Sequence, residues 1–293
     1  MFIATLIAVD RLAAGDISRA RDALAAAGGE PGEAVWLEPE KAADIPFAGD
    51  PAAARTALDA LDGAIDHIVQ AAENRRKKLF VADMDSTMIT VECLDELADY
   101  AGFKDHVAAI TERAMRGELD FIEALDERVL FLKGLSSDIV TQCYEERVRL
   151  MAGGPTLVRT MKAHGARCVL VSGGFTLFAD RVAADIGFDR AIANTLEIEN
   201  GALTGTVARP IVDSATKERV LDEESAALGL KAAETLAIGD GANDLAMIRK
   251  AGLGIAFYGK PKLREAADAR IDHGELTALL YAQGYRRQDW VDA

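Results

Sequence analysis

Two carboxylates in the segment Asp83-Met84-Asp85-Ser86-Thr87 constrain the fold of this chain more than any other feature. The segment follows Leu79-Phe80-Val81-Ala82, an apolar run that predicts a short strand buried on both faces. Taken alone, the motif is more simply a strand-to-helix turn whose polar residues cap the next helix. In an open α/β sheet, however, ligands bind beyond the carboxyl ends of the strands. Asp83 and Asp85 are then expected to face one crevice, where one attacks an electrophile and the other transfers protons.

Two more predicted strands end in small and polar residues. These segments are Val171-Ser172-Gly173-Gly174, after Cys168-Val169-Leu170, and Gly239-Asp240-Gly241-Ala242-Asn243-Asp244, after Leu236-Ala237-Ile238. Gly173 lets the backbone approach a ligand closely, and Ser172 adds a hydroxyl donor for a phosphate. Each segment alone is typical of a glycine-rich turn. Matched polar chemistry at three strand ends favours one shared site instead.

The oxygen-only chemistry of these strand ends predicts a Mg²⁺ site. We expect Asp83, Asp240 and the backbone carbonyl of Asp85 to bind the ion, with Asp244 supporting them from behind. Lys217, near the start of a predicted helix, would place a cation beside the phosphoryl oxygens and the aspartates. A lysine in that position is usually solvated, so its interpretation depends on the other motifs.

The alternation of strands and helices after residue 155 indicates an α/β fold with a doubly wound, mainly parallel sheet. Residues 92–151 are helical in pattern, with breaks near Gly102, Gly117 and Gly134, and predict a helical cap inserted into a core domain of residues 78–285. Glu199-Asn200-Gly201 predicts a hairpin.

Residues 1–74 predict a small α+β module that resembles a shortened amino-acid-binding regulatory domain. Its expected elements are strands at 2–9 and 34–37, a helix at 17–27, a loop at 38–50 and an amphipathic helix at 52–73. The basic run Arg75-Arg76-Lys77-Lys78 is interpreted as a solvated linker between the module and the core.

Composition excludes several classes of function. With 33 basic and 48 acidic residues the net charge is −15, which repels nucleic acid and anionic membranes. Cys93, Cys143 and Cys168 are too few and too widely spaced for a disulfide framework or a zinc site. The sequence shows neither a signal peptide nor an apolar stretch long enough to span a bilayer, so we expect a cytoplasmic protein.

In chain order, Asp83-x-Asp85, Ser172, Lys217 and Asp240-x-x-x-Asp244 resemble the four motifs of the haloacid dehalogenase superfamily. The resemblance covers residues 78–285, and Glu92 with the segment Phe121 to Arg128 narrows it to the phosphoserine phosphatase family. It implies Mg²⁺-dependent hydrolysis of O-phosphoserine to serine and phosphate, the last step of serine biosynthesis. Asp83 would be the nucleophile that forms an aspartyl-phosphate, and Asp85 the proton donor and base.

The same resemblance implies the substrate contacts. Arg128 would bind the serine carboxylate, Glu92 would bind the ammonium, and Met115 and Phe121 would exclude water. Ser172, Gly173, Lys217 and Asn243 complete the implied substrate-binding set. From the residues alone, Arg128 is one of several charges on a helix face, Glu92 favours a helix N-terminus, and the two apolar residues are core of the cap.

Three rival functions stay open at this point. The first is a phosphotransferase or a phosphatase for another small phosphomonoester, which the cap residues Glu92 and Arg128 disfavour. The second is a receiver-like signalling module, which Asp85 and the long helical insertion disfavour. The third is a catalytically silent binding protein, for which the intact motif set offers no support. Beyond a small-molecule substrate, the only partner that the sequence leaves open is a second copy of the chain in a homodimer.

Overall fold

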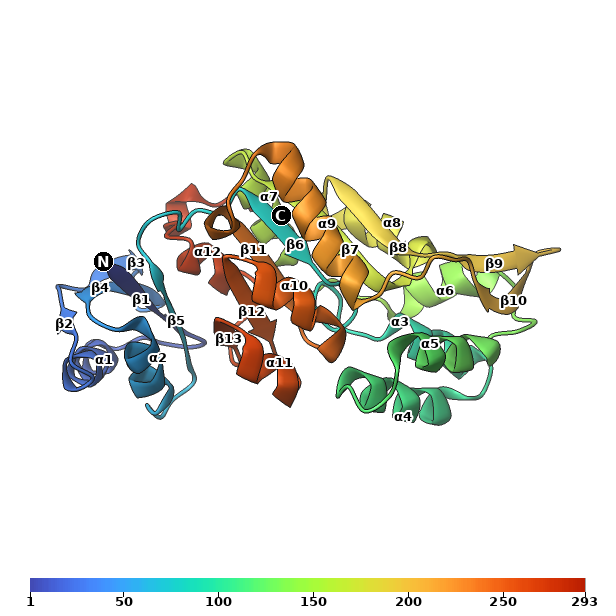
Figure 1. The fold of residues 1–293 in the computed structure, drawn as a ribbon, viewed down its shortest axis with the longest axis horizontal. Helices are drawn as coiled ribbons and strands as arrows, with labels where there is room; N and C mark the ends of the chain where they lie inside the picture. Colours follow the sequence, from blue (N-terminus) through green and yellow to red (C-terminus); the bar gives the residue numbers. More distant parts are fainter. Residues whose placement is uncertain (293) are drawn as a thin grey trace.

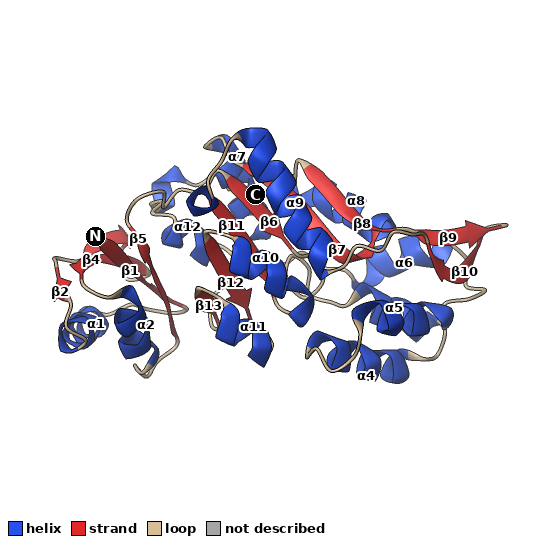
Figure 2. Ribbon diagram, viewed as in Figure 1, coloured by secondary structure: helices blue, strands red, loops and turns tan. Residues whose placement is uncertain are grey.

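The central sheet contains six strands in the order β13-β12-β11-β6-β7-β8, and each neighbouring pair is parallel (Figures 1 and 2). The structure is a computed structural model that describes residues 1–292. The strands are β6 (Leu79–Ala82), β7 (Arg167–Phe175), β8 (Arg190–Asn194), β11 (Thr235–Gly239), β12 (Leu253–Phe257) and β13 (Ala269–Ile271). The predicted α/β fold with a parallel sheet is confirmed.

Helices cover both faces of this sheet. One face packs on α7 (Gly154–Ala163), α8 (Thr176–Ile186) and α12 (Ala278–Ala282), and the other on α9 (Ser214–Leu228), α10 (Leu245–Lys250) and α11 (Pro261–Ala266). In β6, Phe80 and Ala82 belong to the first core and Leu79 and Val81 to the second. This two-residue alternation between two apolar layers explains why the strand is apolar throughout.

Four helices follow the first strand of the sheet, as the sequence predicts. They are α3 (Cys93–Tyr100), α4 (Lys104–Met115), α5 (Phe121–Leu130) and α6 (Asp138–Arg147). The chain enters and leaves this cap through two adjacent segments, joined by hydrogen bonds from Thr90 N to Arg149 O and from Met151 N to Met88 O. The predicted hairpin, β9 (Leu196–Glu199) and β10 (Ala202–Val207), also packs on the cap, against α5 (Figure 1).

The N-terminal module differs from its predicted structure at two places. Its elements are β1 (Phe2–Ala8), α1 (Ala14–Ala26), β2 (Glu30–Pro31), β3 (Val35–Glu38), β4 (Ala42–Ala48), α2 (Pro51–Asp59) and β5 (Ile65–Ala71). The predicted loop at 38–50 is wrong, because it contains β4. The predicted helix at 52–73 is also wrong: it ends at Asp59, and β5 pairs antiparallel with β1.

The physical reason for the second error is a coincidence of spacing. Leu58, Ile65, Ile68 and Val69 fit one helical face, but α2 ends at Asp59, and Gly63, at a φ of +134°, lies in the turn that follows it. Most of β5 is buried on both sides, so its sequence lacks the alternation that identifies a half-exposed strand.

The basic run at residues 75–78 is only partly a solvated linker: Arg76 and Lys78 are exposed as predicted, but the prediction is wrong for Arg75 and Lys77. The Arg75 side chain is 14% exposed and forms a buried ion pair with Asp44, whose nearer oxygen lies 2.5 Å away. Arg75 Nε also donates to the carbonyl of Ala282 at 2.7 Å, and Lys77 Nζ donates to the carbonyl of Ala233 at 2.8 Å. Arg75 therefore ties the N-terminal sheet to the C-terminal segment of the core.

A second polar contact joins the same two parts. The carboxylate of Asp66, in β5, accepts hydrogen bonds from the backbone N–H groups of Asp272, His273 and Gly274 at 2.8, 3.2 and 2.8 Å. Burial raises the pKa of Asp66, although these hydrogen bonds oppose the shift. The module thus docks through specific polar contacts as well as apolar packing.

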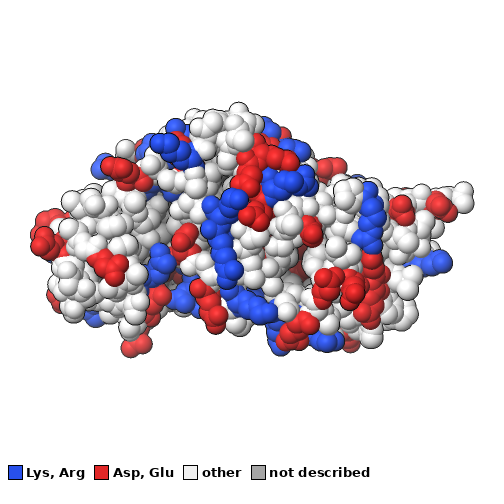
Figure 3. Space-filling model, in the orientation of Figure 1, with Lys and Arg blue, Asp and Glu red and all other residues white. Residues whose placement is uncertain are grey.

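Other whole-chain features agree with the composition. Cys93, Cys143 and Cys168 are free and buried. On the face drawn in Figure 3, basic and acidic side chains are interspersed. Within residues 1–292, the helices are all too short or too polar to cross a membrane.

Arg75→Ala should lower the free energy of unfolding by about 3–5 kcal/mol, because it leaves the buried carboxylate of Asp44 without its counter-ion. Urea denaturation monitored by circular dichroism measures the loss. Lys78→Ala is the matched control from the same basic run, since Lys78 is 62% exposed and should change stability little. Equal stabilities of the two variants would contradict the structural role given to Arg75.

Candidate active site

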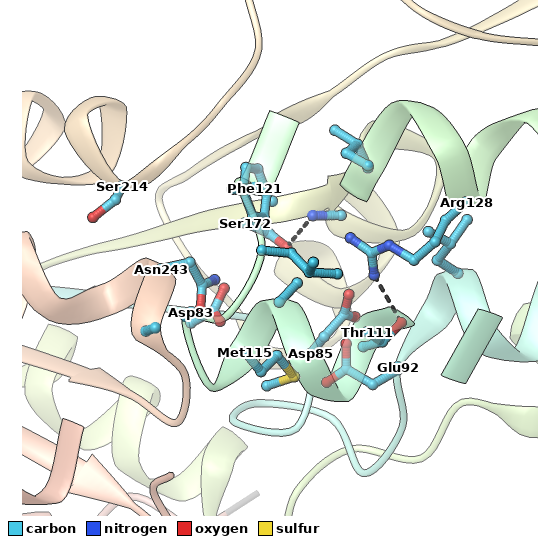
Figure 4. Close-up of a pocket in the computed structure, with 18 of the residues that line it drawn as sticks. Asp83, Asp85, Glu92, Thr111, Met115, Phe121, Arg128, Ser172, Ser214 and Asn243 are labelled. Carbon is cyan, nitrogen blue, oxygen red and sulfur yellow. Dashed lines mark hydrogen bonds between the residues drawn. The ribbon is translucent and has the colours of Figure 1, made fainter. Parts of the chain in front are cut away.

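A cavity of about 210 Å³ lies between the cap and the carboxyl ends of β6 and β7 (Figure 4). It contains both carboxylates of the Asp83 motif and most of the substrate-binding residues that the sequence suggested. Lining residues are Asp83, Asp85, Glu92, Leu94, Thr111, Ala114, Met115, Gly117, Leu119, Phe121, Leu125, Arg128, Ser172, Gly173, Gly174, Phe175, Ser214, Ala242 and Asn243. The fold therefore brings residues from the first strand end and from three cap helices to one cavity.

Below this cavity, Lys217 joins two strand ends. Its ammonium group is fully buried and lies 2.6 Å from Asp83 Oδ1, in an ion pair that lacks hydrogen-bond geometry, and 2.7 Å from Asp244 Oδ1, to which it donates a hydrogen bond. Burial alone would lower the pKa of Lys217, but the carboxylates of Asp244 and Asp83 outweigh it and raise the pKa. Lys217 therefore remains a cation.

Asp244 has both carboxylate oxygens engaged. Its Oδ2 accepts from the backbone N–H groups of Asp240 and Gly241, each at 3.2 Å. Burial raises the pKa of Asp244 to about 6, and the charge of Asp83 adds to the shift while Lys217 opposes it. With its oxygens occupied in this way, Asp244 holds the turn that carries Asp240.

The carboxylates fit a divalent cation. Asp83, Asp240 and Asp244 each offer an oxygen, and these atoms lie within 4.8 Å of one another. Burial raises the pKa of Asp240 well above its usual range, and the charges of Glu92 and Asp244 raise it further. Within residues 1–292, Asp240 Oδ1 has no hydrogen-bond partner. A buried carboxylate oxygen without a partner, in a cluster short of positive charge, is suited to a hard cation.

The second carboxylate of the motif, Asp85, has a different environment. Burial raises the pKa of Asp85 well above its usual value, and the negative charges of Glu92 and Asp83 raise it further. Glu92 lies beside it at the start of α3 and accepts a hydrogen bond from Ser86 Oγ at 2.5 Å. Burial raises the pKa of Glu92 to about 7, although the bond from Ser86 opposes the shift. Two neighbouring acids are thus biased toward holding a proton near neutral pH.

Arg128 enters the cavity from α5 (Figure 4). Its side chain is buried, with Nε donating to the carbonyl of Ala124 at 2.9 Å and Nη1 donating to Thr111 Oγ1 at 2.8 Å. Burial lowers the pKa of Arg128, and the carboxylates of Asp95 and Glu92 oppose that shift. A guanidinium and the Glu92 carboxylate therefore line the same cavity, with opposite charges available to a zwitterion.

The second strand end forms a tight backbone cradle. Ser172 Oγ accepts a hydrogen bond from Gly174 N at 2.9 Å. A Cβ atom at Gly173 would lie 2.8 Å from Phe121, and one at Gly174 would lie 2.9 Å from Asp85 Oδ2. Glycine is required here because a cap ring and a carboxylate both contact the backbone.

The cap is held over the core by contacts from α4. Met115 Cε lies 3.2 Å from the position of a Cβ at Gly241, so its thioether end reaches the third strand end. Lys260 Nζ forms a 2.8 Å ion pair with Glu112, and Lys262 Nζ donates to the carbonyl of Gly117 at 3.0 Å. These contacts therefore hold α4 and the loop that follows it beside the third strand end.

Sequence reasoning missed several residues of this site. Asn194 stands at the end of β8, donates to the carbonyl of Gly173 at 2.8 Å and accepts from Val212 N at 2.8 Å. Its position at a strand end was a usable signal. Ser214 is the first residue of α9, one turn before Lys217, and that spacing was its only signal. Thr111 gave none, because a threonine inside a cap helix is ordinary.

The chain is similar to known proteins in sequence and in fold. The model of the family described as haloacid dehalogenase-like hydrolase matches residues 80–249. The chain is 47% identical over 206 residues to a phosphoserine phosphatase of Archaeoglobus fulgidus, covering 70% of this chain and 60% of that protein. It is 49% identical over 208 residues to a phosphoserine phosphatase of Albidiferax ferrireducens. That match covers 69% of this chain and 88% of that protein.

A solved structure described as a phospho-aspartyl intermediate analogue of phosphoserine phosphatase superposes with a TM-score of 0.67 at 37% identity. The match covers 70% of this chain and 98% of that one. The chain thus spans three fifths of the Archaeoglobus relative and nearly all of the solved structure.

Asp240→Asn should weaken Mg²⁺ binding by at least about tenfold, since it removes a charged oxygen ligand while keeping the shape of the side chain. Isothermal titration of the protein with MgCl₂ measures the affinity directly, without substrate. Asp222→Asn, on the exposed side of α9, is the control and should bind as the unmodified protein does. Unchanged affinity in Asp240→Asn would exclude Asp240 as a ligand.

Proposed function

The chain belongs to the haloacid dehalogenase-like hydrolases and, among them, to the phosphoserine phosphatases, and from this premise we propose that it hydrolyses O-phosphoserine to serine and inorganic phosphate. One observation carries the proposal: the carboxylate pair Asp83 and Asp85 shares a single cavity with Glu92 and Arg128. The candidate nucleophile and the charged residues that suit a zwitterionic headgroup therefore line the same cavity of about 210 Å³.

In this proposal Asp83 attacks phosphorus and forms an aspartyl-phosphate, while the bond from phosphorus to the serine oxygen breaks. Asp85 gives its proton to the departing serine oxygen, and the raised pKa of Asp85 supports that role. Water then attacks the acyl phosphate and transfers a proton to Asp85, which restores both carboxyl groups. Lys217 balances the charge of Asp83 throughout.

The remaining residues would bind the substrate. Ser172, the backbone N–H of Gly173, and Asn243 would bind the phosphoryl oxygens, since they line the same cavity as the nucleophile Asp83. At the other end, Arg128 would pair with the serine carboxylate and Glu92 with its ammonium. Met115 and Phe121 would exclude water from the space between.

Mg²⁺ is the divalent ion that we propose for the acidic cluster. Asp83, Asp240 and the backbone carbonyl of Asp85 would hold it, and Asp244 would support Asp240 from behind. When bound, the ion would neutralise part of the charge on the phosphoryl oxygens. The partnerless oxygen of Asp240 supports this assignment.

We extend the proposal to domain organisation and location. Residues 78–285 would form the catalytic unit, with the cap inserted at 92–151, and residues 1–74 an accessory module. The solved structure that covers 70% of this chain supports a catalytic unit of that size. Three buried free thiols suit a reducing cytoplasm, which is where we place the enzyme and its part in serine biosynthesis.

Phosphate release across a panel of small phosphomonoesters, with and without Mg²⁺, tests the proposed activity. O-phosphoserine should have the highest kcat/KM of the panel, and chelation of the metal should abolish the activity. Asp83→Asn should abolish turnover of every substrate, because an amide cannot form the acyl phosphate. Mass spectrometry must establish that the introduced amide has not deamidated. Rapid hydrolysis by an intact amide would exclude Asp83 as the nucleophile.

The pH dependence of kcat/KM for phosphoserine should reflect the protonation of Glu92. Its pKa is raised to about 7, so below pH 7 it becomes neutral and no longer attracts the substrate ammonium. We expect kcat/KM for phosphoserine to fall below pH 7 more steeply than kcat/KM for 3-phosphoglycerate, in which a hydroxyl replaces the ammonium. Glu92→Gln should remove the difference between the two profiles. Parallel profiles in the unmodified enzyme would contradict the role of Glu92.

A further inference from the structure

The guanidinium of Arg128 is fixed at two of its three nitrogen atoms. Nε donates to the carbonyl of Ala124, one turn earlier on α5, and Nη1 donates to the hydroxyl of Thr111 on α4. Among residues 1–292, no hydrogen bond or ion pair engages Nη2. Arg128 lines the cavity and is 6% exposed, so its orientation is decided by these two bonds and not by solvent.

The hydroxyl of Thr111 has two further contacts besides Arg128. Thr111 Oγ1 lies 2.6 Å from Asp95 Oδ1 on α3 and 3.1 Å from the carbonyl of Val107 on its own helix. A hydroxyl group has one proton to donate and two lone pairs to accept with. The shorter contact, to a carboxylate, is the stronger one, so the proton points to Asp95 and the lone pairs face Arg128.

No hydrogen bond within α3 explains why Asp95 is buried. It stands in the first turn of α3, where an acidic side chain commonly caps the helix, but α3 has no side-chain capping bond. The residue is 8% exposed, and its carboxylate faces α4 instead. Burying a carboxylate is costly unless its hydrogen bonds and nearby charges offset the loss of hydration, and here those partners are Thr111 and Arg128.

The three residues come from three different cap helices and form one chain of hydrogen bonds from carboxylate to hydroxyl to guanidinium (Figure 4 shows the bond from Arg128 to Thr111). We propose that Asp95 and Thr111 are positioning residues, which hold Arg128 with its free Nη2 toward the substrate carboxylate and so set the preference for an amino-acid headgroup. The proposal rests on the proposed phosphoserine phosphatase function.

Thr111→Val tests the proposal, because it removes the hydroxyl and keeps the branched shape. KM for phosphoserine should rise about 10- to 100-fold, the effect of losing a hydrogen bond to a charged group, with kcat changed less. For p-nitrophenyl phosphate, which has no carboxylate, kcat and KM should stay within about twofold. Thr111→Ser restores the hydroxyl and should return KM for phosphoserine to nearly its original value.

Asp95→Asn tests the carboxylate end of this series of hydrogen bonds. An amide oxygen still accepts the bond from Thr111 but lacks the charge, so the rise in KM for phosphoserine should be smaller than in Thr111→Val. If Thr111→Val does not fold, as urea denaturation would reveal, Asp95→Asn and Thr111→Ser supply the test.

A double-mutant cycle separates positioning from general support of the cap. In the Arg128→Ala background, Thr111→Val should produce no further rise in KM, because the group that it orients is gone. Additive effects of the two substitutions on KM would overturn the proposal, as would equal losses of activity on phosphoserine and p-nitrophenyl phosphate. The hydrogen bonds among Asp95, Thr111 and Arg128 would then only support the structure of the cap.

Failure of the proposed function has a different signature. An unmodified enzyme that does not prefer phosphoserine over p-nitrophenyl phosphate would refute the substrate assignment, and the positioning role would fall with it. An enzyme that keeps the preference, while Thr111→Val leaves KM unchanged, would refute the positioning role alone.

Discussion

The buried ammonium of Lys217 is the contact on which the whole site depends. Asp83 and Asp244 come from different strand ends, and two carboxylates at that distance repel each other strongly in a dry environment. Lys217 pairs with both, and it arrives on a helix whose start is fixed by the bond from Thr216 N to Asp213. Neutralising this repulsion is what lets the three strand ends meet and leaves Asp240 free for a cation.

The cap and the N-terminal module both pack into the apolar core of the sheet, and polar contacts add to each attachment. The cap meets the core through the ion pair of Lys260 with Glu112, which is partly exposed and contributes little to stability. The N-terminal module is held differently, by the buried ion pair of Arg75 with Asp44, which is costly to break. The two ion pairs therefore differ in what they contribute to stability.

The sequence predicted the core of the fold well because its signals were local. Apolar runs such as Leu79–Ala82 end in polar residues, and parallel strands place those ends on one edge of the sheet. The predictions failed where a pattern fitted two structures, as at 52–73, or where a charged residue was assumed to be solvated. Arg75 is the clearest example: nothing in its neighbours along the chain reveals Asp44 or the carbonyl of Ala282.

By itself, the sequence determined the class of fold, the family and the motif residues, because these depend on order along the chain and on the chemistry of each side chain. The tertiary structure alone decided which residues orient the others. Thr111 and Asp95 acquire their meaning from the packing of three cap helices around Arg128, and Asn194 from its bond to Gly173. Such contacts join residues that are far apart in the chain, and their hydrogen-bond geometry appears only once the helices and strands have packed.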